Sequence, residues 1–265
     1  MNVQPCVSFN LLFMEPLLIM TKKRKVNTIH NNGNGNKYNN GNGNGNGYGD
    51  ITPTYKLLRE FKPKTKGQAE YVRAIAESDV VICSGVAGTG KTAVAVGIGC
   101  AHLIYGKVNK IVITRPVVEA GNRSIGYLPG TANEKLHPYL LPILDEMSMY
   151  FTDYEIQKMI AQNIIEIAPL QYMRGRSFHK SFMILDESQN ADISEIKMFV
   201  TRIGVGSKCV INGDLHQSDL DNGKLGLQTC IDKLSCVDGV SIVELTTIDI
   251  IRNPIIGRIL AKLEM

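Results

Sequence analysis

The sequence predicts one α/β domain with a mostly parallel central sheet and helices on both of its faces. Three observations predict it: short β-branched runs, longer helical segments around them, and apolar residues that fill the runs almost without a break. Strands have this character when helices cover both faces of a parallel sheet, because neither strand face then meets water. With 265 residues, of which 44% are hydrophobic and 20% charged, the chain has the composition of an ordinary globular protein.

The expected strands and helices alternate along most of the chain. Strands are expected at β-branched runs such as "VVICS" and "FMILD", over residues 80–84, 111–114, 164–167, 182–186, 208–212 and 240–244. Helices are expected around them, over residues 66–77, 90–104, 134–149, 154–161, 192–203, 223–235 and 252–264. Because no internal repeat is visible, these elements form a single domain.

The first 50 residues differ in composition from the rest. The stretch "NNGNGNKYNNGNGNGNGYGD", residues 31–50, is mostly Asn and Gly, which bury too little apolar area to offset the entropy of ordering. We therefore expect a flexible, basic extension over residues 1–50 and a folded domain over residues 51–265. Met20 begins "MTKKRKV" and would make a natural start, so residues 1–19 are expected to be an upstream extension.

Positive charge is concentrated near the start of the chain. Residues 1–66 carry ten Lys/Arg and three Asp/Glu, whereas the remaining 199 residues carry nineteen and twenty-two. A basic arm on a slightly acidic body suits a polyanionic partner such as a nucleic acid. A solvated charge run that keeps the tail soluble explains the pattern equally well.

Cysteine usage and the apolar start bear on the compartment. The six cysteines form no CxxC pair, which argues against a zinc site and favours reduced thiols in a cytoplasmic protein. The run "VSFNLLFMEPLLIM" is too short to span a bilayer, and its positive charges follow it, in the wrong order for a signal peptide. No membrane association is expected.

A glycine-rich turn joins an expected strand to an expected helix. The stretch "GVAGTGKT" has glycines that let backbone N–H groups turn inward around an anion, and the helix N-terminus adds its dipole. In this pattern the Lys reaches the β- and γ-phosphates and the Thr hydroxyl binds Mg²⁺. The cofactors expected are therefore a nucleoside triphosphate and Mg²⁺, held by Gly85, Val86, Ala87, Gly88, Thr89, Gly90, Lys91 and Thr92.

Two adjacent acids close the strand expected at 182–186. Asp186 at the strand tip can hold the metal through water, and Glu187 is placed to orient and deprotonate an attacking water. Two acids at the end of a buried strand are unfavourable without a cation nearby. The pair favours nucleotide hydrolysis over a simple kinase, which would need an acceptor pocket.

A polar stretch follows the next strand, in "KCVINGDLHQSDL". Asn212, Asp214, His216 and Gln217 follow or close a parallel strand, at the sheet edge where ligands bind in open α/β sheets. Gln217 is expected to sense the γ-phosphate, with an ordinary polar loop as the alternative. His216 is expected to pack or to form hydrogen bonds rather than to catalyse.

Eight segments of the chain carry a family pattern. They are "SGVAGTGKT", "ITRPVVEAG", "IGYLPGT", "PYLLPILDEM", "IEIAPLQYMRGRSF", "MILDESQN", "MFVTRIGVGSKCVINGDLHQSDL" and "DIIRNPI". Together, and in this order, they resemble the PhoH family of P-loop ATPases, from about residue 56 to residue 265. The short form is similar to those of bacteriophages, and a phage-encoded protein is expected in the host cytoplasm. The resemblance implies a RecA-like core related to superfamily 1 helicases, ATP hydrolysis and a role with RNA.

The same resemblance implies further site residues. Gln68 looks like the glutamine that selects the adenine edge of ATP, since an amide pairs with a donor and an acceptor together. Arg252 resembles the arginine that contacts the γ-phosphate, with a helix cap as the alternative. Arg115, Arg174 and Arg176 are candidate nucleic-acid contacts, with internal salt bridges as an equal alternative.

Two classes of function remain open. A single core of this kind lacks the second wall that a monomeric helicase closes on its polymer, so the resemblance implies a homo-oligomer, with a hexamer as the expected form. The first class is an ATP-driven motor or remodeller of RNA or single-stranded nucleic acid. The second is a nucleotide-regulated assembly or binding module, favoured by the absence of Trp and of an evident stacking platform.

Overall fold

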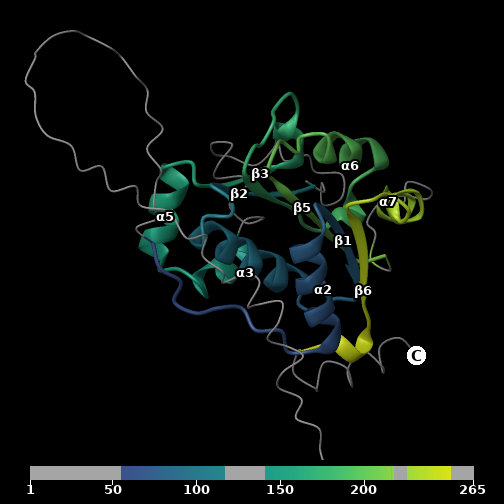
Figure 1. Ribbon diagram of the computed structural model, residues 1–265, viewed down its shortest axis with the longest axis horizontal. Coiled ribbons are helices and arrows are strands. Elements are labelled where there is room, and N and C mark those ends of the chain that lie inside the picture. Colours follow the sequence, from purple (N-terminus) through teal and green to yellow (C-terminus); the bar gives the residue numbers. More distant parts are fainter. Residues whose placement is uncertain (1–54, 117–140, 216, 218–225, 252–265) are drawn as a thin grey trace, which may run out of the picture.

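The central element of the fold is a six-stranded sheet. The computed structural model describes residues 55–116, 141–215, 217 and 226–251. Within them the strand order is β3-β2-β4-β5-β1-β6, and every neighbouring pair is parallel (Figure 1). The strands are β1 (Val80–Gly85), β2 (Lys110–Arg115), β3 (Ile165–Pro169), β4 (Ser181–Leu185), β5 (Lys208–Gly213) and β6 (Val240–Leu245). All six predicted strands are confirmed to within two residues at each end, and the sheet confirms the predicted α/β class.

The helices also follow the prediction, with one end misplaced. The described helices are α2 (Lys66–Glu77), α3 (Lys91–Ile104), α5 (Asp153–Ala161), α6 (Ile193–Val200) and α7 (Gly226–Leu234), and residues 141–148 are helical as well. Helix α6 ends three residues before the predicted boundary at 203, because Ile203 instead forms a parallel bridge with Phe178. The helix predicted at 252–264, and the first residues of those predicted at 134–149 and 223–235, lie outside the described residues.

Local capping sets where two of these helices begin. Thr152 and Glu155 form a reciprocal capping box at the start of α5, and Asp192 and Glu195 form another at the start of α6. Each box satisfies two backbone N–H groups that a helix N-terminus leaves free. The sequence therefore encodes these two starts locally, independently of the sheet.

Alternating strand residues divide the core into two layers. On one face, Val81 and Cys83 of β1 join residues of α2, α3 and α5 in one buried cluster. On the other face, Ile82 of β1 packs in a second cluster with residues of α6 and α7. Because both strand faces are apolar and covered, the strands appear in the sequence as nearly continuous hydrophobic runs. Helices therefore lie on both faces, as predicted.

The strand order fixes where polar residues meet. Strand β5 lies between β1 and β4, so the loop after β1 and the acids after β4 do not lie on adjacent strands. All the strands run in one direction, and their carboxyl ends share one edge of the sheet. That edge is where open parallel sheets bind ligands. Among the described residues, none of the helices combines the length and hydropathy needed to cross a lipid bilayer.

A buried histidine lies in the last turn of α3. His102 is 3% exposed, its ring packs edge-on against Phe182 at 5.2 Å, and its Nε2 atom has no hydrogen-bond partner among the described residues. Burial lowers the pKa of His102 from 6.5 to about 3, and the nearby Lys107 and Lys208 add to the effect. The neutral imidazole is therefore the form that the folded protein accommodates.

This histidine makes the free energy of unfolding depend on pH. Below pH 6.5 His102 binds a proton in the unfolded chain, whereas in the folded chain it stays neutral down to about pH 3. The free energy of unfolding therefore falls as the pH drops through that range. Replacing His102 by Phe should reduce the loss of unfolding free energy between pH 7 and pH 5 by about 2 kcal/mol. Urea unfolding of both proteins at the two pH values measures this. An equal loss in both would show that His102 does not carry the effect.

Candidate functional site

The glycine-rich turn forms a short loop between β1 and α3. Gly88 and Gly90 have φ angles of 87° and 84°, in the left-handed region that favours glycine. Gly85 serves a different purpose, because a Cβ atom there would lie 2.6 Å from the carbonyl oxygen of Leu245 on β6. The turn thus depends on glycine both for its backbone angles and for its contact with the neighbouring strand.

The cation of this loop lies over the loop's own carbonyls. Lys91 Nζ donates hydrogen bonds to the carbonyl oxygens of Gly85 and Val86, the second at 3.2 Å. Thr89 is fully buried and its hydroxyl donates to Val86 O at 2.9 Å, which closes the loop internally. The positive charge of Lys91 and the N-terminus of α3 therefore lie at the same place, a combination that suits a polyphosphate.

Asp186 is the buried anion of the site. It follows β4, is 1% exposed, and accepts a hydrogen bond from Thr92 Oγ1 at 3.0 Å. Arg115, at the end of β2, donates to Asp186 Oδ2 from Nε at 3.0 Å and from Nη2 at 2.5 Å. Because an unpaired buried carboxylate is unfavourable, Asp186 depends on these partners in the interior. The first turn of α3 and the ends of β2 and β4 therefore meet at one carboxylate.

Thr92 and Asp186 together form a donor set that fits Mg²⁺. The ion prefers hard oxygen ligands, and with nucleotide phosphates present it needs only one or two protein carboxylates. The hydroxyl and carboxylate at 3.0 Å supply such oxygens. No cluster of three or more His, Cys, Asp or Glu suited to a metal occurs among the described residues, so the chain shows no all-protein metal cage there.

Glu187 stands apart from its neighbour in conformation and exposure. Its φ of 56° places it in the left-handed region, which is unusual for a residue other than Gly, Asn or Asp and is strained. Its carboxylate is exposed and accepts a hydrogen bond from Gln189 Nε2 at 2.7 Å. Strand β4 ends at Leu185. After Asp186 and the left-handed Glu187, the chain continues as a short 3₁₀ turn, Ser188–Asn190.

Gln189 is a site residue that the sequence did not single out. While its Nε2 atom binds Glu187, its Oε1 atom accepts a hydrogen bond from the backbone N–H of Asp214 at 3.0 Å. One buried amide therefore links the acid after β4 to the loop after β5, and Gln217 N donates to Asp214 O in that loop at 3.3 Å. A glutamine two residues after an acid pair carries no sequence signal for such a bridge.

Eight of the predicted site residues meet in one pocket of about 350 Å³. Lys91, Thr92, Asp186, Glu187 and Gln217 line it together with Ala87, Gly88 and Gly90, and Glu146 and Ile251 also contribute. Loop, acid pair and Gln217 are thus brought together from three separate strand ends. Their assignment as nucleotide and metal ligands remains a prediction.

Glu146 is a second residue that the sequence did not place in the site. It lies in the helical stretch 141–148, half-buried against the pocket. Burial raises the pKa of Glu146, the nearby Arg59 and Lys64 oppose this, and the charge of Asp186 adds to it. Glu146 belongs to the segment "PYLLPILDEM", but the spacing of residues in that segment does not indicate which way the Glu146 side chain faces.

Gln68 is held against the loop from outside. It lies in the first turn of α2 and is 1% exposed, and its Nε2 atom donates to Thr89 O at 2.8 Å. Its Oε1 atom accepts from the backbone N–H of Lys64 at 2.9 Å. The amide thus ties α2 to the glycine-rich loop, and its role in selecting adenine stays a prediction.

The chain after β6 contacts the same loop. Asp249 is buried, and its carboxylate accepts hydrogen bonds from the backbone N–H groups of Gly67 and Thr246 at 3.2 and 3.0 Å. Two residues later, Ile251 N donates to Gly88 O at 3.2 Å. The start of α2, the glycine-rich loop and the exit from β6 are therefore joined at one point, which sequence patterns did not reveal because the partners lie far apart in the chain.

Asn212 faces away from the pocket. Alternation along β5 points it into the layer under α2, where it is fully buried and accepts a hydrogen bond from the hydroxyl of Tyr71. Burial raises the pKa of the Tyr71 phenol well above its usual value, so it stays a donor. The polar residue at the end of this strand is thus part of the core.

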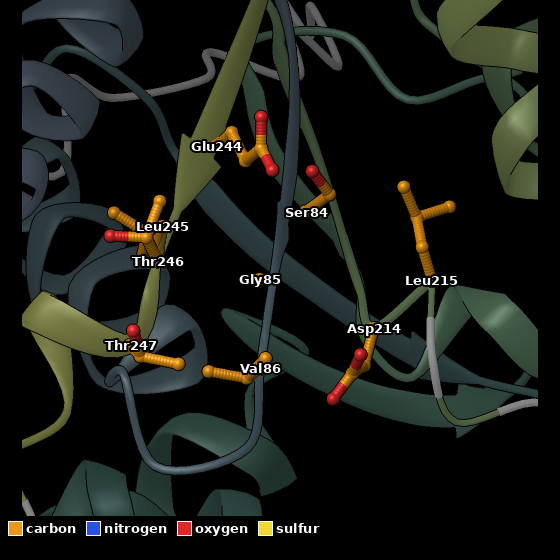
Figure 2. A pocket seen from close by; sticks show the side chains of 9 residues that line it. All are labelled: Ser84, Gly85, Val86, Asp214, Leu215, Glu244, Leu245, Thr246 and Thr247. Carbon is orange, nitrogen blue, oxygen red and sulfur yellow. The ribbon is translucent and has the colours of Figure 1, made fainter.

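A second pocket, of about 180 Å³, lies on the other side of the loop's first residues. Figure 2 shows Glu244 of β6 and Asp214 after β5 on opposite sides of β1, with Ser84, Gly85 and Val86 between them. Asp214 lines both pockets. Gly85 and Val86, predicted as nucleotide ligands, therefore line this second pocket rather than the larger one.

The three arginines proposed to contact nucleic acid lie in different settings. Arg115 pairs with Asp186, and Arg176 forms an ion pair with Glu166 and lies 4.7 Å from the ring centroid of Phe178. For these two, the structure shows the internal salt bridges that were the alternative. Arg174 is exposed and lines a shallow pocket next to α6. Arg252 and His216 lie outside the described residues.

The Arg115–Asp186 pair leads to a stability prediction. The side chains of Arg115 and Asp186 are 15% and 2% exposed, so replacing Arg115 by Gln leaves a buried charge with a weaker partner. We expect a loss of about 3 kcal/mol in the free energy of unfolding, measured by urea denaturation. The double variant with Asp186→Asn should lose less than the sum of the two single variants. Additive losses would show that the two side chains do not interact.

Comparison with known sequences adds the family. A family model described as "PhoH-like protein" matches residues 60–264. The chain is 44% identical over 203 residues to the PhoH-like protein of Bacillus subtilis, covering 76% of this chain and 63% of that protein. It is 43% identical over 202 residues to that of Mycobacterium tuberculosis H37Rv (76% and 57%), and 35% identical over 202 residues to Protein PhoH of Escherichia coli K12 (74% and 56%). The matched region therefore spans less than two thirds of each relative.

Solved structures resemble the chain more distantly. They include the large terminase of a thermophilic bacteriophage, at a TM-score of 0.47 and 14% identity over 76% of this chain and 50% of that one. The Pyrococcus furiosus Hef helicase domain has a TM-score of 0.43 and 14% identity over 71% and 39%. Likeness at this level assigns no activity. The match over most of the chain does assign a family: with its glycine-rich loop and six-stranded parallel sheet, this P-loop NTPase belongs to the PhoH-like protein family.

Proposed function

We propose that this chain is a Mg²⁺-dependent ATPase that couples hydrolysis to the binding or remodelling of RNA or another single-stranded nucleic acid. The observation that carries the proposal is the contact between Thr92 Oγ1 and Asp186 Oδ1 at 3.0 Å, beside Lys91 and Glu187. It joins the glycine-rich loop to a carboxylate, and hydroxyl and carboxylate oxygens are ligands of the kind that Mg²⁺ prefers. Membership of the PhoH-like family supports nucleotide binding.

Charged and polar residues of the larger pocket have proposed roles in ATP hydrolysis. Lys91 would neutralise the β- and γ-phosphate oxygens, and Thr92 and Asp186 would hold Mg²⁺, which when bound would lend further positive charge to those oxygens. Glu187 orients a water and accepts its proton as the water oxygen attacks the γ-phosphorus and the bond to the β-phosphate oxygen breaks. Gln189 holds the Glu187 carboxylate by its 2.7 Å hydrogen bond, which limits the directions it can face.

The link to the polymer is proposed to run through the loop after β5. Gln189 connects Glu187 with the backbone of Asp214, and Asp214 accepts a hydrogen bond from the backbone of Gln217. A change at the γ-phosphate would therefore reach this loop through two hydrogen bonds. Arg252 is proposed, from the family resemblance, as a further contact to the γ-phosphate.

The first test of this proposal replaces Glu187 by Gln. The amide can still accept the hydrogen bond from Gln189 but cannot take the proton of the attacking water, so turnover should fall about 10²- to 10⁴-fold. Binding of ATP should persist, because Lys91 and Thr92 are unchanged. Steady-state ATPase assays measure the first effect and equilibrium titration with a fluorescent ATP analogue measures the second.

Polymer dependence is measured in the same assay. Glu77→Gln, an exposed acid at the end of α2, serves as the matched control and should keep full activity. Single-stranded RNA, single-stranded DNA and duplex are added in turn, and one of them should stimulate turnover of the wild type but not of Glu187→Gln. Turnover that no polymer changes would remove the coupling and leave a nucleotide-regulated assembly or binding module.

A homo-oligomer is the second part of the proposal, with a hexamer as the expected form. It rests on the family resemblance, because one core of this kind needs a neighbouring subunit to complete a polymer channel. Light scattering at micromolar protein with Mg-ATP should give about 175 kDa, six times the chain mass of 29.2 kDa. A mass of one chain under those conditions would contradict both the oligomer and processive unwinding.

A further inference from the structure

A row of exposed cations leads up to the first described helix and ends on its first residue. We name it the basic ridge and define it as Lys56, Arg59, Lys62, Lys64 and Lys66, all of them exposed. Figure 1 shows the segment that carries it running from α5 past α3 to the start of α2. The segment contains one acid, Glu60, whose carboxylate accepts a hydrogen bond from the hydroxyl of Tyr105. The ridge therefore carries a strong local excess of positive charge.

The backbone under the ridge is fixed to the domain. Tyr55, Leu57 and Phe61 pack against the core cluster on the α3 face. Leu58 N donates to Tyr150 O at 2.9 Å, and the Tyr55 hydroxyl donates to Gln162 at 2.7 Å. These contacts distinguish the ridge from a solvated tail, because its charges stand on an ordered support.

The cations at the end of the ridge alternate with half-buried residues. Phe61, Pro63 and Thr65 are half-buried, whereas the Lys residues between and after them are exposed. In an extended chain, side chains two positions apart point the same way and lie about 7 Å apart. Lys66 also has Glu70 at 3.9 Å, but both side chains are largely exposed, so this pair contributes little. Lys62, Lys64 and Lys66 thus recur at every second position of the sequence, and each of them is exposed.

The ridge ends beside the nucleotide pocket. The backbone N–H of Lys64 donates to Gln68 Oε1, and Gln68 Nε2 donates to the carbonyl of Thr89 in the glycine-rich loop. Two hydrogen bonds through one buried amide therefore separate the ridge from the loop. A partner that displaced the ridge backbone would therefore shift Gln68 and the glycine-rich loop. A nucleotide that displaced the loop would shift the ridge backbone in the same way.

We infer that the basic ridge binds the phosphodiester backbone of a single-stranded nucleic acid. This rests on the proposed function and gives it a location. Four of the five cations are lysines, and an ammonium group suits a point contact with a phosphate, a kind of contact that carries no base sequence. Two of the arginines first considered for this role, Arg115 and Arg176, are engaged in ion pairs instead.

The test removes three charges and measures the dependence of binding on salt. The triple variant Lys62→Gln, Lys64→Gln and Lys66→Gln should bind oligo-U RNA or oligo-dT DNA about a hundredfold more weakly at 0.1 M salt. Each lost phosphate contact reduces the slope of log K against log salt by about 0.7, so the magnitude of the slope should fall by about 2. Fluorescence anisotropy at four salt concentrations gives both quantities, with RNA and DNA in separate series.

Two further triple variants control for charge and fold. Lys62→Arg, Lys64→Arg and Lys66→Arg should keep the wild-type slope, because the charge remains. Lys180→Gln, Lys197→Gln and Lys233→Gln remove the same number of exposed charges away from the ridge and should also keep it. Thermal unfolding of each variant within about 2 °C of the wild type would show an intact fold.

The outcomes separate this inference from the proposed function. If the wild type binds and the triple Gln variant shows the same salt slope, the inference is overturned and the proposed function stands. No binding of either polymer by the wild type would overturn both. If the ridge variant kept its affinity for RNA and DNA but lost affinity for anionic phospholipid vesicles, the ridge would be a membrane contact and the inference would be wrong.

Discussion

A single buried carboxylate holds the site together. Asp186 accepts hydrogen bonds from Thr92 in the helix after β1 and from Arg115 at the end of β2, and it is itself fixed at the end of β4. Such a charge is tolerated in the interior only when cations or donors surround it. The compensation brings together residues 94 and 71 positions away in sequence. These side-chain bonds add to the backbone pairing of β2 with β4 and tie the glycine-rich loop to the same strand end.

Hydrogen bonds that do not involve Asp186 also support the glycine-rich loop and the start of α2. Gln68 holds Thr89, and Ile251 holds Gly88, while Asp249 ties the exit of β6 to Gly67. The bonds of Gln68 and Asp249 join a buried side chain to the backbone, and that of Ile251 joins two backbone groups. Each leaves a polar group unsatisfied if its partner is lost. The glycine-rich loop therefore has little freedom of its own, and its shape is set by three separate segments. Preorganisation of this kind reduces the ordering needed when a ligand binds.

Local pattern predicted most of the fold and the core of the site. The strands could be predicted because both of their faces are apolar, and the helix starts because Thr152 and Asp192 cap them within four residues. The phosphate loop and the acid pair could be predicted because their chemistry is contiguous in sequence. Each of these features depends on neighbours along the chain.

What the sequence could not provide were pairings across distance. Arg115 and Arg176 are basic residues in loops or at strand ends in sequence, and only the folded sheet brings Asp186 and Glu166 against them. Gln189 and Asp249 are ordinary polar residues until β5 and α2 lie beside them. A bridge between two strand ends is a property of the sheet order, which no single segment encodes.

The position of β1 has a consequence for how the protein assembles. Val80 pairs with Cys209 on one side and with Val240 on the other, so both neighbours of this strand come from the last quarter of the chain. Contacts of such large sequence separation form slowly, because long loops must close first. During synthesis the phosphate-binding loop emerges early, yet its strand stays unpaired until β5 and β6 follow. The most recognisable segment of the sequence is thus among the last to be held in place.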